Sequence, residues 1–202
     1  SGGHTQFLEV NGVNNYKRLG TTIDDALGET FDKTAKLLGI EFPGGPTIEK
    51  WAKKGNKNYF KLPKPIFKKG GCNLSFAGLK TAVLKISKKL KNINEKYNLA
   101  ASFQKTINEI LYEKTRIAME EFLKNKKKQK TFVIAGGVAS NLSIRENLVN
   151  LANEKNFLPI FPPLNLCSDN AAMIAWTGIE RYKINLIDNL EFPSKARWPL
   201  DN

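Results

Sequence analysis

The sequence predicts an α/β protein, because its last third alternates short apolar strands with capped helices. Residues 131–135 form an apolar strand, and a helix that starts at Ser140 or Asn141 continues to about residue 153. Residues 157–161 form a second strand, after which Ser168 is placed to cap a helix over residues 169–182. Strand, helix and strand joined by short links are typical of a parallel βαβ unit.

The first forty residues predict a hairpin and one long helix. Residues 6–10 and 13–19 are two short strands around Asn11-Gly12, a dipeptide that favours tight hairpin turns. Residues 22–38 place apolar side chains every three or four positions, which gives a helix one apolar face. Its first residue, a threonine, can cap this helix, and the glycine that follows it can end it.

A second face of that helix carries Asp25, Glu29, Asp32 and Lys36 at helical spacing. Pairing of charges three or four residues apart on a solvated face explains this pattern. The alternative is that one of the acids contacts a ligand, and the spacing alone favours the solvated face.

The middle of the chain predicts loops and two further helices. Pro-Gly-Gly-Pro at 43–46 predicts a tight turn or loop, and residues 48–54 a short helix. Residues 57–71 are basic and interrupted by two prolines, so we expect a loop there. Residues 75–90 and 99–123 follow a helical period, and the second has a clear apolar stripe.

Composition limits the classes of function. The chain has 202 residues, of which 41% are apolar and 25% charged, which permits a real core. No apolar run reaches the roughly 20 residues that span a bilayer, and no leader peptide is evident, so we expect a cytoplasmic protein with no membrane contact. Cys72 and Cys167 form no spaced set, which excludes a disulfide framework or zinc knuckle and indicates reduced thiols.

The net charge is +13, from 32 basic and 19 acidic residues. A basic surface attracts phosphate backbones in a salt-sensitive way. The 27 lysines far outnumber the 5 arginines, and Arg is the residue suited to bidentate phosphate contacts. Charge alone therefore leaves two interpretations open: a nucleic-acid surface and a solvated, Lys-rich surface. Residues 124–130 hold several of these lysines, and we expect a solvated turn there.

Three glycine pairs are candidate anion sites. Gly2-Gly3 precedes the first strand, Gly44-Gly45 follows the long helix, and Gly136-Gly137 joins a buried strand to a capped helix. Glycine lets backbone N–H groups approach an anion, and a helix N-terminus adds positive potential. The third pair has the position at which α/β sheets bind ligands. The pattern alone leaves nucleotide binding and ordinary turns as alternatives.

Six motifs follow one another along nearly the whole chain. They are Ser-Gly-Gly-His-Thr-Gln at 1–6, Ile-Asp-Asp-Ala-Leu-Gly-Glu-Thr-Phe-Asp-Lys-Thr-Ala-Lys-Leu-Leu-Gly at 23–39, Pro-Gly-Gly-Pro at 43–46, Ser-Phe-Ala-Gly-Leu-Lys-Thr at 75–81, Ala-Gly-Gly-Val-Ala-Ser-Asn at 135–141 and Cys-Ser-Asp-Asn-Ala-Ala-Met-Ile-Ala at 167–175. In this order they resemble the motifs of the tRNA N6-adenosine threonylcarbamoyltransferase family, also known by the older name O-sialoglycoprotein endopeptidase.

The resemblance implies a two-lobed actin-like ATPase fold, shared with sugar kinases and Hsp70. It implies a cytoplasmic enzyme that transfers a threonylcarbamoyl group from threonylcarbamoyl-AMP to N6 of the adenosine 3′ of the anticodon, in tRNAs reading ANN codons. The implied partners are a paralogous actin-like subunit and a small ATPase. We expect residues 1–165 to form the C-terminal lobe, with a helical insertion over about 46–125. Residues 166–202 would then form a connecting helix and tail that return toward an N-terminal lobe.

The resemblance also assigns residues to an adenylate or ATP-type ligand. Ser1, Gly2 and Gly3 match a loop on its phosphate side, Asp32 an acid near the ribose, Gly45 a backbone contact and Asn141 an adenine-side contact. The alternative for each is structural: turn glycines, a helix-surface acid and a helix-start residue. These are ligand-binding assignments, and the resemblance assigns no catalytic residue.

The implied cofactor is one divalent metal, Fe²⁺ or Zn²⁺, with Asp169 as a ligand. The family's site also uses a His-x-x-x-His pair, whereas this chain has one histidine, His4, which is not one of that pair. Three protein ligands are usual in a catalytic metal site. We therefore expect a fragment that lacks the N-terminal lobe and is inactive alone.

Two other functions share the implied fold. A non-catalytic actin-like paralogue would act as a dimerisation scaffold of the same complex, but the presence of Asp32, Asn141 and Asp169 argues against it. A sugar kinase is disfavoured by the motifs at 1–6 and 167–175.

Overall fold

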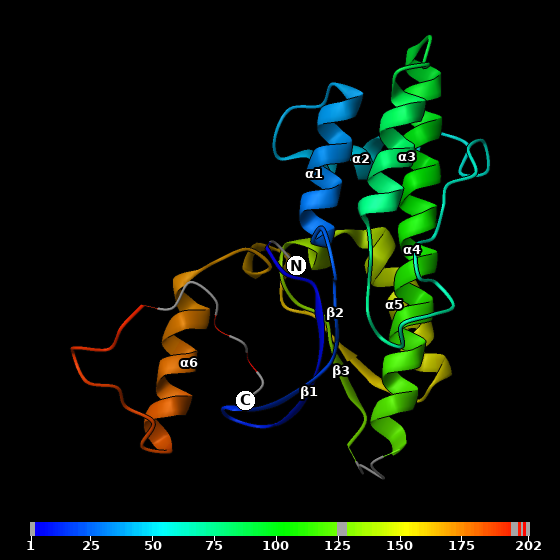
Figure 1. Cartoon of the computed structure of the whole chain (residues 1–202). Coiled ribbons are helices and arrows are strands. Elements are labelled where there is room, and N and C mark those ends of the chain that lie inside the picture. The colour runs from blue at the N-terminus through cyan, green and yellow to red at the C-terminus, as the bar shows by residue number, and fades with distance from the viewer. Residues whose placement is uncertain (1–2, 125–128, 195–197, 199, 201–202) are drawn as a thin grey trace.

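The computed structural model describes residues 3–124, 129–194, 198 and 200, and confirms the predicted α/β class. Figure 1 shows a layer of helices, two small sheets and a terminal helix that stands apart from the layer. In chain order the elements are β1 (Gln6–Gly12), β2 (Asn15–Thr21), α1 (Leu27–Leu38), α2 (Gly44–Ala52), α3 (Ala77–Ser87), α4 (Ile93–Lys124), β3 (Thr131–Val133), the 3₁₀ turn η1 (Gly137–Ser140), α5 (Leu142–Glu154), β4 (Leu158–Ile160), the 3₁₀ turn η2 (Leu164–Leu166) and α6 (Ala171–Lys183).

The hairpin is confirmed, but its turn lies beyond the predicted Asn11-Gly12. Strands β1 and β2 pair antiparallel with Gly12 opposite Asn15, so the turn consists of Val13 and Asn14. Asn14 has a φ of 58°, in the left-handed region that short hairpin turns require and asparagine tolerates. The prediction was wrong because Asn11-Gly12 is the stronger turn signal in the sequence, whereas the pairing of the two strands places the turn at Val13 and Asn14.

Helix α1 begins at Leu27, and the predicted start at Thr22 was wrong. The N–H group of Leu74 donates to the carbonyl of Thr21 at 3.0 Å, and that of Ile23 donates to the carbonyl of Leu74 at 2.9 Å. These bonds hold the segment before the helix in an extended form against the start of α3. Thr22 instead donates its hydroxyl to the carbonyl of Asp25 at 2.6 Å.

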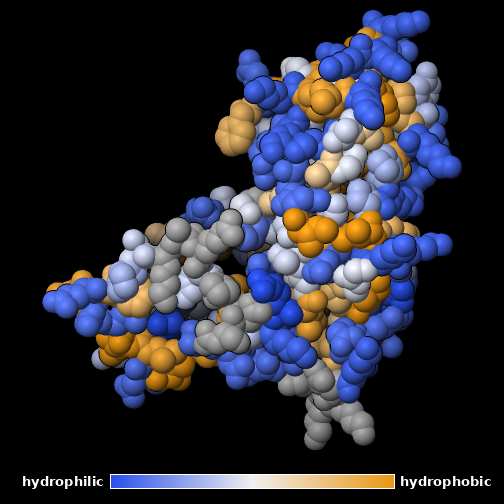
Figure 2. All heavy atoms as spheres, in the orientation of Figure 1, coloured by the Kyte–Doolittle hydropathy of each residue, from blue (hydrophilic) through white to orange (hydrophobic). Residues whose placement is uncertain are grey.

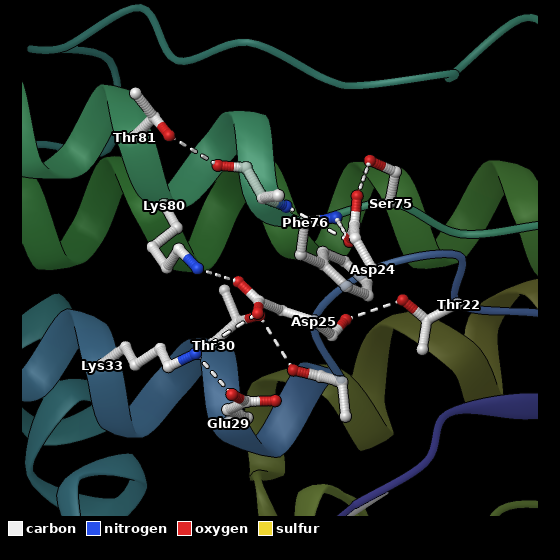
Figure 3. A network of polar contacts seen from close by, with 12 residues as sticks. Thr22, Asp24, Asp25, Glu29, Thr30, Lys33, Ser75, Phe76, Lys80 and Thr81 are labelled. Atoms are coloured by element: carbon white, nitrogen blue, oxygen red, sulfur yellow. Dashed lines mark hydrogen bonds and ion pairs between the residues drawn. The ribbon is translucent and has the colours of Figure 1, made fainter.

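Asp24 and Asp25 have separate tasks at the junction of α1 and α3 (Figure 3). The Asp24 carboxylate accepts hydrogen bonds from the Ser75 hydroxyl and from the backbone N–H of Phe76, the latter at 2.7 Å. Asp24 therefore caps α3 from outside that helix. Asp25 forms ion pairs with Lys80 of α3 and Lys33 of α1. The two adjacent acids thus tie the two helices together.

The long helix α4 is the centre of the core. It extends further than the predicted 99–123, because Asn92 accepts the N–H of Glu95 at 3.0 Å and starts the helix earlier. Its fully buried Phe103 meets Phe31 of α1 edge to face, with ring centroids 5.1 Å apart. Helices α1, α2, α3 and α5 pack around it.

Residues 57–71 lack helix and strand, as predicted, and a buried lysine fixes their end. Lys114 of α4 is fully buried, and its ammonium donates to the carbonyls of Lys69 and Gly71 at 2.6 and 2.9 Å. Burial lowers the pKa of Lys114. The loop is therefore anchored to the middle of the core by a charged group that periodicity does not reveal.

The βαβ unit is confirmed. Strands β3 and β4 pair in parallel, with Thr131 opposite Leu158, and α5 connects them. The predicted turn over residues 124–130 lies largely outside the described residues. Cys72 and Cys167 are free and buried, as expected of reduced thiols.

Helix α6 begins at Ala171, so the predicted Ser168 cap and Asp169 start were wrong. Asn170 caps α6 by accepting the N–H of Met173 at 3.0 Å. No residue of α6 is buried. None of the described helices is long and apolar enough to cross a membrane.

We expect Asp25→Asn to lower the free energy of unfolding by about 1 kcal/mol at neutral pH. Lys80 and then Lys33 lower the pKa of Asp25 below its ordinary value of 3.8. A carboxyl with a lowered pKa in the folded protein stabilises the fold above its unfolded pKa. That contribution is lost as pH falls through the folded pKa. The difference between wild type and variant should therefore persist above pH 3.8 and shrink below it.

Urea unfolding followed by circular dichroism at several pH values measures this difference. Glu29→Gln is the control, because Glu29 pairs with Lys33 on the exposed side of α1. An Asp25→Asn difference that does not change with acid pH would contradict the assignment.

Candidate functional site

A pocket of about 880 Å³ lies where α1, α2 and the start of α5 meet. This volume is in the range of pockets that enclose small organic ligands. Its walls come from one face of α1, the loop before α2, the first turns of α2, η1 and η2. The sequence-predicted residues Asp32, Gly45 and Asn141 all line it.

Asp32 lies on α1 and is half-buried in the pocket wall. Its Oδ1 accepts a hydrogen bond from the N–H of Gly44 at 3.1 Å. An acid at this point also complements the positive end of the α2 dipole. Asp32 therefore fixes where α2 begins, and its second carboxylate oxygen is not used by this bond.

The two glycines at the start of α2 have different roles. A Cβ atom on Gly44 would lie 2.1 Å from the Cβ of Ala35, so α1 and α2 approach this closely only with glycine there. Gly45 has no atom within 4 Å of such a Cβ position and faces open space. The predicted turn at 43–46 is thus partly wrong: both glycines already belong to α2, and its N-terminus lies in the pocket wall.

Asn141 is buried and caps α5. Its Oδ1 accepts the N–H of Ile144 at 3.0 Å, and its Nδ2 donates to Oε1 of Gln104 on α4 at 2.9 Å. The amide retains one N–H and one lone pair beyond these two bonds. The residue therefore has a structural role that the sequence indicated and a contact to α4 that it did not.

Two pocket-wall helices are joined by further polar contacts. The Oε1 of Glu49 on α2 accepts the N–H of Ser143 on α5 at 3.1 Å. Asn108 of α4 donates to the Ser143 hydroxyl at 2.8 Å and accepts from Gln104 at 3.0 Å. Sequence reasoning missed Glu49, Gln104 and Asn108, since no local pattern marks contacts between distant helices.

The segment after β4 closes the pocket on a third side. Arg145 of α5 donates through Nη2 to the carbonyl of Pro162 at 2.9 Å and to Sγ of Cys167 at 3.1 Å. Its guanidinium also lies 4.7 Å from the ring centroid of Phe161. These contacts place Leu164 of η2 in the pocket wall.

The pocket mouth combines charge with one large exposed ring. Phe42 lines the pocket with 83% of its surface exposed. Lys33 lies at the mouth beside Glu29, and Glu29 and Asp25 raise its pKa. Apolar walls, a helix N-terminus and a few polar groups suit a ligand that has a flat ring and an anionic group.

Two of the remaining predicted site residues, Gly3 and Asp169, are among the described residues, and neither lines this pocket. Ser1 and Gly2 lie outside the described residues, and Gly3 is exposed. Asp169 is exposed, between η2 and α6. Among the described residues there is no group of three His, Cys, Asp or Glu side chains that could hold a metal ion.

Comparison with known proteins matches the sequence of this chain to one family. The family model described as tRNA N6-adenosine threonylcarbamoyltransferase matches residues 1–176. A protein of that name from Pelagibacter ubique is 69% identical over the whole chain, which covers 57% of that relative. Relatives of the same name from Rickettsia massiliae and Rhodospirillum rubrum are 51% and 47% identical over the whole chain. The chain thus spans between 57% and 60% of the length of these relatives.

Asn141 and Asn170 each cap a helix, so comparing their substitutions tests what the hydrogen bond from Asn141 to Gln104 contributes. We expect Asn141→Ala to lower the free energy of unfolding by about 3 kcal/mol, because it removes a cap and leaves the buried Gln104 amide without its donor. Asn170→Ala removes the cap of the exposed α6 and should cost about 1 kcal/mol or less. Thermal or urea unfolding measures both. Equal costs would show that the contact with Gln104 contributes nothing.

Proposed function

Because the chain belongs to the tRNA N6-adenosine threonylcarbamoyltransferase family, we propose that its pocket holds the adenylate from which a threonylcarbamoyl group is transferred to tRNA. The acceptor in this proposal is N6 of the adenosine 3′ of the anticodon, in tRNAs reading ANN codons. The names of the relatives favour this transferase over the non-catalytic scaffold.

One observation carries the proposal: Asp32, Gly45 and Asn141 come from three separate motifs and line the same pocket. A structural role for each residue alone does not require them to share a cavity. The resemblance assigned all three to one ligand, so their convergence supports a common ligand.

The residues suit the parts of an adenylate. The N-terminus of α2 offers positive potential and backbone donors to a phosphate, and Gly45 leaves room for its approach. The second oxygen of Asp32 can accept hydrogen bonds from ribose hydroxyls. The exposed ring of Phe42 and the remaining amide capacity of Asn141 are available to the base.

The chain's part in the transfer is to bind and orient. The N6 nitrogen forms a bond to the carbamoyl carbon and loses one proton to solvent. The bond from that carbon to the phosphate oxygen breaks, and AMP leaves with the electron pair of that bond. Donors at the start of α2 stabilise the negative charge that remains on the phosphate. Holding the carbamoyl carbon in a fixed position removes part of the entropic cost of the reaction.

We propose the actin-like ATPase arrangement for the wider fold, with residues 166–202 packed against a second lobe. Figure 2 shows hydrophobic side chains on the projection at the left, which in Figure 1 consists of α6 and the segment that follows it. Ile174, Trp176 and Tyr182 of α6 are each more than 60% exposed. Burial of such side chains against protein is favourable, which supports a packing partner for this helix.

A metal centre does not fit the described residues alone, because Asp169 is the one predicted ligand among them. We propose Asp169 as a single ligand of an Fe²⁺ or Zn²⁺ ion whose other ligands belong to the rest of the enzyme. Such an ion would supply Lewis-acid stabilisation of negative charge.

Calorimetric titration with AMP and ATP tests the pocket. The wild-type chain should bind saturably, and Asp32→Ala should weaken binding about tenfold. Asp32→Asn keeps an acceptor for the Gly44 N–H and separates the loss of charge from the loss of α2 positioning. Glu146→Gln, an exposed acid on α5 outside the pocket, is the control. An absence of saturable binding would favour the scaffold instead.

The metal assignment has its own test in a full-length relative such as the Pelagibacter ubique protein. Replacing the residue aligned with Asp169 by alanine should reduce bound iron or zinc about tenfold or more, measured by mass spectrometry of the metal. The residue aligned with Asp188 is the control position. Metal content that survives the first substitution would refute the assignment.

A further inference from the structure

The positive charge of this chain is concentrated in one segment. Residues 50–94, here called the lysine segment, contain no acidic residue. The remaining residues hold 19 basic and 19 acidic side chains, so the lysine segment carries the whole net charge of +13. Its lysines are Lys50, Lys53, Lys54, Lys57, Lys61, Lys64, Lys68, Lys69, Lys80, Lys85, Lys88, Lys89 and Lys91.

Most of this charge is exposed and unneutralised. Every lysine of the segment is exposed except Lys80, which pairs with Asp25. Lys64 pairs with Glu109, and the other eleven make no ion pair with a described acid. Elsewhere the pattern differs: Arg116, for example, contacts both Glu113 and Glu120. On an ordinary solvated face, basic and acidic side chains lie next to one another, as they do around Arg116.

The fold gathers two groups of these lysines at one end of α4. After α2, the backbone N–H of Asn56 donates to Oδ1 of Asn98 at 2.8 Å, and Trp51 meets Tyr97 edge to face at 5.3 Å. Gly55 lies so close to Tyr97 that a Cβ atom would be 2.0 Å from its carbonyl oxygen. Lys53, Lys54 and Lys57 are therefore held beside the first turns of α4.

The second group precedes α4 directly. Lys88, Lys89 and Lys91 lie in the turn between α3 and α4, at the top of Figure 1. Asn98 is seven residues beyond Lys91, which is roughly 10 Å along a helix. Figure 2 shows many hydrophilic side chains over this upper end of the molecule. The two groups thus form one basic surface around the start of α4.

Helix α2 connects this surface to the pocket. Its first residues, Gly44 and Gly45, line the pocket, and Lys50 near its end begins the lysine segment. Nine helical residues span roughly 13 Å. A polyanion on the surface would therefore lie within reach of the pocket along a single rigid element.

We propose that the basic surface formed by these two groups of the lysine segment is where the phosphate backbone of tRNA docks, an inference that rests on the proposed function. Lysines act as point charges toward phosphates and position a nucleic acid without reading its sequence. Tyr59, 54% exposed between Lys57 and Lys61, adds an aromatic face on which an unpaired base can stack.

Two triple variants with the same change in charge test the surface. Lys88, Lys89 and Lys91→Gln removes three charges from the segment. Lys17, Lys124 and Lys183→Gln removes three exposed charges from β2, α4 and α6. The probe is an unmodified, fluorescein-labelled tRNA transcript that reads an ANN codon. Its anisotropy is measured against each protein from low to physiological salt.

The segment variant should bind the tRNA at least about tenfold more weakly, and the slope of log affinity against log salt should fall by about 2–3. The control variant should stay within about twofold of wild type. Equal losses in the two variants, or no tRNA binding by the wild type, would overturn the proposal. A second result would also overturn the proposal: the segment variant keeps its tRNA affinity but no longer binds phosphatidylserine vesicles. That result would indicate that the lysines bind a membrane surface.

The AMP titration separates this inference from the proposed function. If AMP binds but the two triple variants bind tRNA equally, the docking surface is wrong and the pocket stands. If AMP does not bind but the segment variant alone loses tRNA affinity, the surface stands and the pocket is wrong. Unchanged thermal unfolding of both variants confirms that each is folded.

Discussion

The pocket depends on one buried hydrogen bond, from the amide of Asn141 to that of Gln104. Gln104 is buried on α4, and an amide oxygen left unpaired there would be costly. The bond therefore fixes the start of α5 against α4. Glu49 and Ser143 then fix α2 against α5, so helices from three parts of the chain hold the pocket walls in place.

Acidic side chains from outside the helix set the starts of α2 and α3, whereas asparagines cap α4, α5 and α6. Asp24 caps α3, and Asp32 fixes the first residue of α2. Each acid satisfies backbone donors that a helix N-terminus leaves unpaired. Asp32 connects this structural role to the proposed ligand, because only one of its oxygens is used by Gly44.

Charge divides the sequence into two parts, one in which basic and acidic residues balance and one that is basic only. Outside residues 50–94 the charges balance, and many form local ion pairs. Within that segment mutual repulsion among exposed lysines has no described acid to offset it beyond Asp25 and Glu109. A partner that brings phosphates would relieve this repulsion, and α2 places such a partner near the pocket.

The sequence alone determined the α/β class, the βαβ unit, the main helices and the family, because periodicity and motifs are local properties. It also selected Asp32, Gly45 and Asn141, which line one pocket. The tertiary structure decided where elements begin, as at Leu27 of α1 and Gly44 of α2. These boundaries depend on hydrogen bonds to Leu74 and Asp32, and which distant groups meet is decided only when the core packs.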